Sequence, residues 1–147
     1  MHKNKAFTLI EIMIVVAIIA MLAAFAIPMM VRNRMTTNET VAIASCKTIA
    51  SACQSYYSVN IPHTYPSSLV LLGGAAGGPA YIDSSLVSGL RSGYTFTYAL
   101  TTPVSFTVNA NPEFIGRTGN RFFYTDETGR MTANTGGSAG PNDPSVS

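Results

Sequence analysis

The run from Phe7 to Val31 carries one charged side chain, Glu11, and follows Lys3 and Lys5. A helix of about 20 apolar residues spans the hydrocarbon core of a bilayer. As a helix with ~1.5 Å per residue, the uncharged stretch from Ile12 to Val31 is about 30 Å long and can span it. A charged side chain near the centre of such a helix costs on the order of 2.5 to 3.5 kcal/mol. We therefore expect Glu11 either near the membrane edge or paired with a cation.

The composition favours a protein that is covered by a membrane, by an assembly, or by both. Of the 147 residues, 47% are hydrophobic and 11% are charged, whereas soluble domains typically have ~25% charged residues. The formal net charge is +2, and without Lys3 and Lys5 the balance is 9 − 2 = 7 basic against 7 acidic side chains. A neutral body offers no clustered basic face, so we expect no direct nucleic-acid site.

A secretory signal peptide is one explanation of the N-terminal run. Lys3 and Lys5 would form its charged region, and Ala24-Phe25-Ala26 would be its small-residue cleavage site. Cleavage there would leave a secreted enzyme or binding domain that begins at Ile27. The residues around Phe7 favour a different explanation.

The string Lys5-Ala6-Phe7-Thr8-Leu9-Ile10-Glu11-Ile12-Met13 resembles the processing site of type IV prepilins and the related pseudopilins. This resemblance implies that a specialised peptidase cuts between Ala6 and Phe7, so that Phe7 becomes the N-methylated first residue of the mature chain. Pro28 lies at the spacing at which family members commonly carry a helix-bending proline, which agrees with the first motif. Ala6 departs from the pattern, because the family usually has glycine before the cut.

The resemblance also implies a role for Glu11 in subunit assembly. Cleavage creates an α-amine at Phe7, which is positively charged at neutral pH because its unperturbed pKa is about 7.7 to 8. In the family, the carboxylate at the Glu11 position pairs with the N-terminus of a neighbouring subunit as the filament grows. Removing one partner of a buried pair costs about 3 to 5 kcal/mol. The alternative is a carboxylate that stabilises the positive end of its own helix, worth ~0.3 to 1 kcal/mol.

The function implied by the resemblance is that of a structural subunit in a type IV pilus-like surface filament. Its partners would be further copies of the chain, the prepilin peptidase and N-methyltransferase, and the inner-membrane assembly machinery, with the lipid bilayer as its surroundings before assembly. It would cross the bacterial inner membrane once and then enter an extracellular filament, to which adhesion, twitching or DNA uptake would belong. The alternative within the family is a pseudopilin of a type II secretion system, which assembles into a periplasmic pseudopilus.

The apolar pattern predicts one long helix over residues 7–60, after a leader at residues 1–6. Residues 7–31 would form the membrane span and later the filament core, and residues 32–60 an amphipathic continuation. A helix from Phe7 to about Tyr57 would be roughly 75 Å long at 1.5 Å per residue. A small domain cannot bury all of it, so its first half needs lipid or neighbouring helices and its second half needs a head domain. Pro28 removes one backbone hydrogen bond and should kink the helix.

Cys46 and Cys53 are the two cysteines of the chain, seven residues apart on one face of the predicted helix. Their separation along the axis is about 10.5 Å, whereas a disulfide needs Cα atoms within ~7 Å. We therefore expect two small buried thiols that face the head. An intersubunit bridge and metal ligation are the alternatives, and with His2 and His63 as the only histidines the zinc signal is poor.

The head, residues 61–147, is expected to contain a connector, a sheet and a flexible tail. The connector at residues 61–92 holds the glycine-rich run from Gly73 to Pro79, which no Gly-Lys-Ser or Gly-Lys-Thr follows, so a phosphate loop is not expected. Helical turns are expected near residues 67–72 and 84–87. Alternation of apolar and polar residues predicts strands at residues 93–100 and 104–110. Further strands are expected at residues 121–125 and 130–133, with a hairpin loop at residues 126–129 between them.

These elements predict an α+β fold in which a long N-terminal helix packs on an antiparallel sheet of three or four strands, residues 93–133. This is the pilin architecture. Residues 134–147 are mostly small and polar and are expected to form the flexible tail. The alternating Tyr and Phe residues are expected in the sheet core rather than in an electron path.

We expect no enzymatic activity, cofactor or metal site in the head. Asp126 and Glu127 are adjacent and fit an ordinary solvated turn. A calcium site built from them with Asn134 or Asp143 is the alternative, because major pseudopilins often bind calcium through an acidic C-terminal loop. No serine, histidine and acid arrangement stands out.

The intact mass of the mature protein separates the two N-terminal processing routes. Prepilin-type processing gives a chain that begins at Phe7 and carries a methyl group on its α-amine. A signal peptidase would instead give a chain that begins at Ile27. Mass spectrometry of the protein purified from its native membrane therefore tests the motif directly, and a chain beginning at Ile27 contradicts the filament interpretation.

Overall fold

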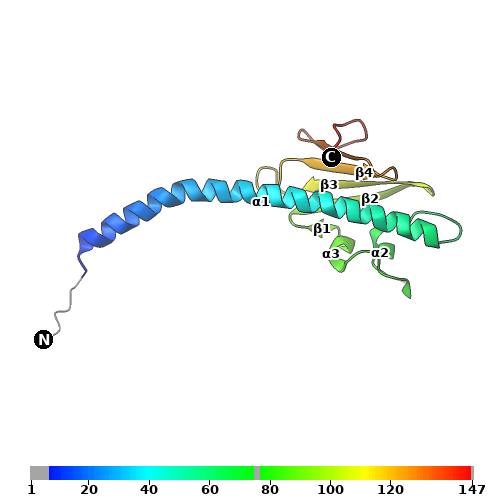
Figure 1. The fold of residues 1–147 in the computed structure, drawn as a ribbon, viewed down its shortest axis with the longest axis horizontal. Coiled ribbons are helices and arrows are strands. Elements are labelled where there is room, and N and C mark those ends of the chain that lie inside the picture. Colours follow the sequence, from blue (N-terminus) through cyan, green and yellow to red (C-terminus); the bar gives the residue numbers. More distant parts are fainter. Residues whose placement is uncertain (1–6, 75–76, 147) are drawn as a thin grey trace. The chain divides into compact units, whose positions relative to one another are not determined.

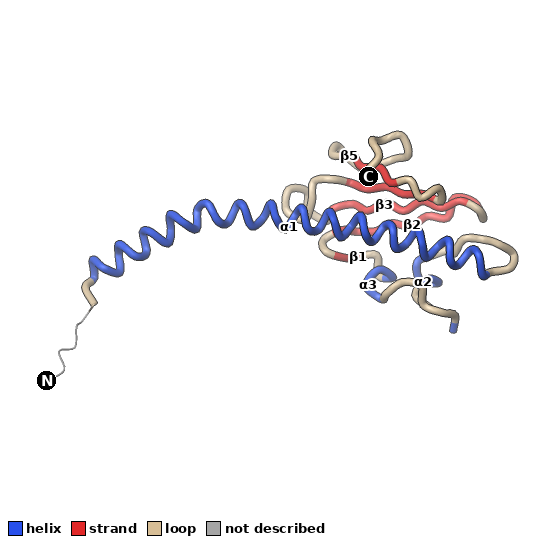
Figure 2. The backbone as a smooth tube through the Cα atoms, viewed as in Figure 1, coloured by secondary structure: helices blue, strands red, loops and turns tan. Residues whose placement is uncertain are grey.

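The computed structural model describes residues 7–74 and 77–146, so the predicted leader and Ala6 lie outside the described residues. The chain divides into two compact units, Met1–Arg34 and Met35–Ser147. One helix, α1, runs through both, and the second unit adds two helical turns and five strands (Figures 1 and 2). The elements are α1 Leu9–Val59, α2 Leu69–Leu72, α3 Ser84–Val87, β1 Leu90–Arg91, β2 Tyr94–Thr102, β3 Ser105–Pro112, β4 Phe122–Asp126 and β5 Met131–Asn134.

The 51-residue helix α1 begins and ends within about two residues of the predicted helix. At its start, the Thr8 hydroxyl accepts a hydrogen bond from the Glu11 N–H at 3.4 Å, and a side-chain acceptor of this kind satisfies one of the free N–H groups of a helix N-terminus. The helix continues past Pro28 without interruption. At its end, the Asn60 side chain donates to Tyr56 O at 2.9 Å, and Pro62 follows two residues later.

The sheet of the second unit is antiparallel throughout, with the strands in the order β1-β2-β3-β4-β5. The predicted fold class is therefore confirmed, with one strand more than the three or four expected. The additional strand is β1, whose two residues, Leu90 and Arg91, pair with Thr95 and Tyr94. Two residues are too few to show an alternating pattern, so β1 could not be predicted from the sequence.

Strand β3 extends through Pro112, two residues beyond residue 110, where the predicted strand ends. Pro112 is the last residue of the strand and lies opposite Tyr94 in β2. The β3–β4 pairing stops at Ala110 opposite Phe123, so no neighbouring strand needs a donor from the proline nitrogen. Proline is tolerated in a strand at such positions.

The hydrophobic core lies between the second part of α1 and one face of the sheet (Figure 1). The buried positions of α1 follow helical spacing, as the amphipathic pattern predicted, and strands β2 and β3 present alternate apolar residues to them, with Phe123 of β4 beside these. Burying one large apolar side chain contributes about 1.5 to 3 kcal/mol. The fully buried members include Ala42, Cys46, Ile49, Cys53, Leu72, Leu86, Tyr94, Phe106, Val108, Ala110 and Phe123.

The hairpin between β4 and β5 has the predicted loop. Gly129 donates to Asp126 O at 3.0 Å and has a positive φ of 74°, which glycine adopts at little cost. The chain after β5 then turns back along that strand, because Ala133 donates to Pro144 O at 3.0 Å and Val146 donates to Met131 O at 2.8 Å. The flexibility expected for residues 134–147 stays a prediction.

The loop between β3 and β4 is tied to the first head turns of α1. The Glu39 carboxylate accepts from the Asn120 N–H at 2.9 Å and from Arg121 Nε at 2.8 Å. The Asn38 side chain donates to Thr118 O at 3.0 Å. Charge-assisted hydrogen bonds are stronger than neutral ones, so these contacts fix the path of the loop across α1.

Replacing Gly119 in this loop by alanine should destabilise the head. A Cβ at Gly119 would overlap the Tyr94 hydroxyl, and Tyr94 is fully buried with its hydroxyl donating to Arg121 O at 2.9 Å. Overpacking of this kind costs about 1 to 3 kcal/mol. We expect Gly119→Ala to lower the melting temperature of the full-length chain in detergent.

Gly137→Ala is the matched control, because no heavy atom lies within 4 Å of a Cβ built there. It should leave the melting temperature close to that of the wild type. Equal melting temperatures for the two variants would contradict the packing described for Gly119.

Candidate functional site

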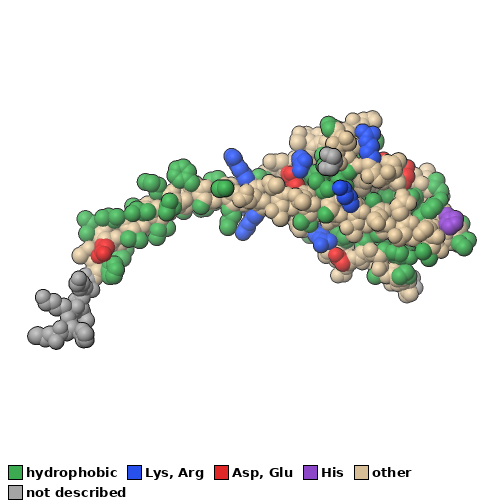
Figure 3. Space-filling view, viewed as in Figure 1, with side chains coloured by type: hydrophobic (Ala, Val, Ile, Leu, Met, Phe, Trp, Pro, Cys, Tyr) green, Lys and Arg blue, Asp and Glu red, His purple; other side chains and the backbone are tan. Residues whose placement is uncertain are grey.

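The first unit exposes nearly all of its apolar side chains. Phe7, Leu9, Met21 and Phe25 are 75%, 78%, 67% and 77% exposed. Figure 3 shows hydrophobic side chains along the visible face of this helix. The helix is long and apolar enough to cross a membrane, with a mean hydropathy of 2.8 over its most apolar stretch, none of which is buried. A surface of this kind needs lipid or protein cover.

Glu11 lies exposed in the first turns of this helix. Among the described residues, no cationic side chain lies within ion-pair distance of its carboxylate. Its backbone N–H contacts Thr8 through both the carbonyl oxygen, at 3.2 Å, and the side-chain hydroxyl. The geometry therefore leaves the carboxylate available to a partner, while its position also fits the alternative of stabilising its own helix end.

Pro28 lies inside α1, where it supplies no N–H to the carbonyl of the preceding turn. The large side chains around it, Ile27, Met29 and Met30, are 63%, 66% and 59% exposed. The kink predicted at Pro28 stays a prediction.

The residues weighed for a calcium site have other partners. The Asp126 carboxylate accepts from the backbone and hydroxyl of Thr128, and Glu127 accepts from the Ser105 hydroxyl at 3.0 Å. The Asp143 carboxylate lies in the C-terminal loop, where it accepts from the Asn134 side chain at 3.1 Å and from a backbone N–H. In the described residues, the structure brings together no group of three acidic, cysteine or histidine side chains that could hold a metal ion.

The two cysteines are free and fully buried in the head core, as predicted. Burial raises the pKa of the Cys46 and Cys53 thiols to about 12. The thiolate is the reactive and metal-binding form. Neither residue is therefore poised for redox or metal chemistry in the folded head.

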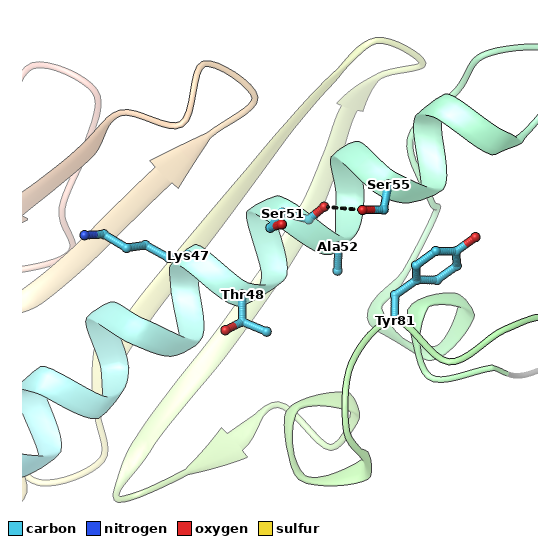
Figure 4. Close-up of a pocket in the computed structure, with 6 residues that line it drawn as sticks. All are labelled: Lys47, Thr48, Ser51, Ala52, Ser55 and Tyr81. Atoms are coloured by element: carbon cyan, nitrogen blue, oxygen red, sulfur yellow. Dashed lines mark hydrogen bonds between the residues drawn. The ribbon is translucent and has the colours of Figure 1, made fainter.

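Figure 4 shows a shallow groove of about 380 Å³ beside the exposed face of α1. It is lined by hydroxyl-bearing residues, one lysine and one tyrosine: Thr48, Ser51, Ser55, Lys47 and Tyr81, with Ala52 at its floor. The Ser55 hydroxyl donates to Ser51 O at 3.1 Å, and the Thr48 hydroxyl donates to Ala44 O at 2.9 Å. The hydroxyl donors of Thr48 and Ser55 are thus used within the helix. The groove lining contains neither a carboxylate nor a histidine that would act as a general base.

No pattern in the sequence predicted that Asn38, Glu39 and Arg121 anchor the β3–β4 loop. The first two lie about 80 positions from their partners along the chain. In the sequence, Asn38 and Glu39 look like ordinary solvated residues on a polar helix face. Only folding brings them next to their partners in the β3–β4 loop.

Comparisons with known proteins place the N-terminal motif in a family context. A family model described as "Prokaryotic N-terminal methylation motif" matches residues 1–27. The "Type IV wide pilus major component PilA4" of Thermus thermophilus is 35% identical over 94 residues, which cover 64% of this chain and 72% of that protein. The "Type IV major pilin protein PilA" of Myxococcus xanthus is 43% identical over 56 residues, which cover 38% of this chain and 26% of that protein. No solved structure matches the chain significantly.

The buried thiols lead to a prediction about chemical labelling. A rise in pKa from 9 to about 12 leaves about 1,000-fold less thiolate at pH 8, and burial blocks access as well. We expect iodoacetamide at pH 8 to leave the native full-length chain unmodified and to modify both cysteines after denaturation.

Ser51→Cys is the matched control, because Ser51 is exposed on the same helix. Its thiol should react at an ordinary rate in the native chain. Rapid modification of Cys46 or Cys53 in the native wild type, read by peptide mass, would contradict the buried assignment.

Proposed function

This chain belongs to the type IV pilin family, and we infer that it is a structural subunit of a type IV pilus that enters the filament through α1. The observation that carries this inference is the exposed apolar surface of residues 7–31, most of which lies within the methylation motif matched at residues 1–27. The match to the Thermus pilin covers most of that protein, so the resemblance is not confined to the motif.

The apolar surface of the first unit explains why such a chain assembles. Large side chains from Phe7 to Met30 are between 47% and 78% exposed. Lipid tails cover such a surface before assembly, and the equivalent helices of neighbouring subunits cover it in a filament. Membrane anchoring and polymerisation thus use one surface at different stages.

We propose that a prepilin peptidase cuts between Ala6 and Phe7 and that the new amine of Phe7 is then methylated. The family motif at residues 1–27 supports this order of events. The precursor crosses the bacterial inner membrane once, and the filament machinery of that membrane extracts it during assembly. We assign no catalytic step to the chain itself.

Within the filament, Glu11 pairs with the charged N-terminus of a neighbouring copy. Its exposed position and the absence of a cationic partner among the described residues support this assignment. Both charges would lie among apolar helices, where pairing offsets the cost of desolvation. A copy shifted along the axis would leave both charges unpaired, so the contact sets the register between subunits.

The alternative filament is the pseudopilus of a type II secretion system. Both relatives are named as pilus components, which favours the pilus. Shearing cells and analysing the released material separates the two. We expect this chain in long surface filaments, whereas its absence there, combined with loss of exoprotein export on deletion, would favour the pseudopilin.

Substitution of Glu11 tests the charge pairing. We expect Glu11→Ala and Glu11→Gln to insert into the membrane at wild-type levels but to give few or irregular filaments, because the neighbouring amine loses its counter-charge. Glutamine preserves hydrogen bonding at the helix N-terminus, so its failure would point to the charge. Membrane fractionation and electron microscopy of sheared filaments provide the two measurements.

Thr8→Ala is the control for the helix-capping alternative, because it removes the hydroxyl that accepts from Glu11 N–H. We expect it to leave filaments nearly intact. Regular filaments from Glu11→Gln, or equal defects in Thr8→Ala and Glu11→Gln, would contradict pairing between subunits.

A further inference from the structure

Strand β2 has an unpaired outer edge beyond its first three residues. Phe96 N donates outward to Gly89 O at 2.7 Å, whereas Gly93 O accepts from Glu113 N at 2.9 Å on the opposite side. Backbone groups alternate between the two sides of an antiparallel strand. The N–H and C=O groups of Tyr98 and Leu100 therefore point away from β3, and in the described part of the chain neither residue has a backbone partner on that side.

The other edge of the sheet is closed. There the C-terminal segment runs along β5, with Thr132 opposite Ser145, Ala133 donating to Pro144 O, and Val146 donating to Met131 O. Within the described residues, the head thus offers other chains the outer edge of β2, with unsatisfied backbone groups at Tyr98 and Leu100.

The open edge lacks the features that usually keep such edges apart. Residues Tyr94–Thr102 contain no charged side chain and no proline, and β-prone Thr, Tyr and Phe residues predominate. A register irregularity is found only at the end, between Leu100 and Thr102. Such an uncharged edge pairs most readily with another uncharged strand, because no charged side chain between the two strands is then left without a counter-charge.

Space for an added strand lies directly beside this edge. An open groove of about 350 Å³ follows Phe96, Thr97 and Tyr98 on one side, and the other side is lined by residues 67–70, at the start of α2, and by residues 87–89, at the end of α3. Val70 in this groove is 51% exposed, and Leu100 at the end of the edge is 37% exposed. The groove is thus partly apolar and open along the unpaired backbone.

We propose that the β2 edge pairs with the same edge of a second copy of this chain, antiparallel and about a two-fold axis. A second copy offers the same edge, so this pairing joins β2 with β2. The register that satisfies every outward group places Tyr98 opposite Leu100 of the second copy and Leu100 opposite its Tyr98. Ala99 then lies on the two-fold axis, opposite Ala99 of the second copy, with its side chain on the exposed face.

The two-fold symmetry determines where this contact occurs. A two-fold contact is closed and self-complementary, whereas a filament whose subunits all point the same way is built from head-to-tail contacts. On the proposed pilus function, the β2 pairing therefore lies between subunits of different filaments and joins filaments side by side. The pairing itself requires only two heads and is independent of filament formation.

Cysteine cross-linking of the full-length chain in detergent tests the pairing and its register without filaments. In the proposed register, the two Ala99 residues face each other as a non-hydrogen-bonded pair of antiparallel strands. The Cα atoms of such a pair lie about 4.5 Å apart, within the range of a disulfide. We expect Ala99→Cys to give at least about five-fold more disulfide-linked dimer than Thr95→Cys, which is equally exposed on the same face but lies beside β1. The buried native thiols do not interfere.

A dimer yield of Ala99→Cys no higher than that of Thr95→Cys, or cross-linking of Ala99→Cys to a protein of different mass, would overturn the proposal. Lysine variants supply an independent test on sheared filaments. Ala99→Lys places like charges opposite each other, so we expect single filaments that no longer associate laterally in electron micrographs, whereas Thr95→Lys filaments associate as the wild type does. Unchanged lateral association of Ala99→Lys filaments would also overturn it.

Discussion

The apolar side chains of α1 all need cover, and this chain supplies it only in the head. Between Ala42 and Cys53 the apolar stripe of the helix is buried against the sheet, whereas from Phe7 to Val31 the large apolar side chains are exposed. Burial of apolar surface contributes ~25 cal/mol per Å² to stability, so leaving the apolar side chains from Phe7 to Val31 in water would be strongly unfavourable. The proposed membrane anchoring and the proposed assembly through α1 both follow from that exposed surface.

The head covers the second part of this helix with its core. Its core uses small side chains on α1, including Ala42, Cys46 and Cys53, and large aromatic ones on the sheet. Tyr65 and Tyr98 each pack against Phe106, with ring centroids 4.7 and 5.8 Å apart. Aromatic pairs of this geometry contribute about 0.5 to 1.5 kcal/mol beyond their area. The aromatic residues thus act as core, which fits a structural subunit.

Elements with a regular period could be predicted from the sequence. The 3.6-residue pattern indicated α1, the two-residue alternation indicated β2 and β3, and Asp126-Glu127-Thr128-Gly129 indicated the hairpin. Two features escaped prediction. Strand β1 is too short to have a period, and β3 includes Pro112 because no strand lies beside the proline nitrogen. In both cases the neighbouring strands decide the outcome.

The sequence by itself determined the chemistry of the N-terminus: the motif around Ala6 and Phe7, the position of Glu11 and an apolar run long enough to span a bilayer. These are local properties, fixed by residue type and spacing along a single helix. Only the tertiary structure decided that Glu39 holds Asn120 and Arg121, that the C-terminal segment closes the β5 edge and that the β2 edge stays open. Such contacts join residues far apart in the chain, so they depend on the path of the folded backbone, which no local pattern encodes.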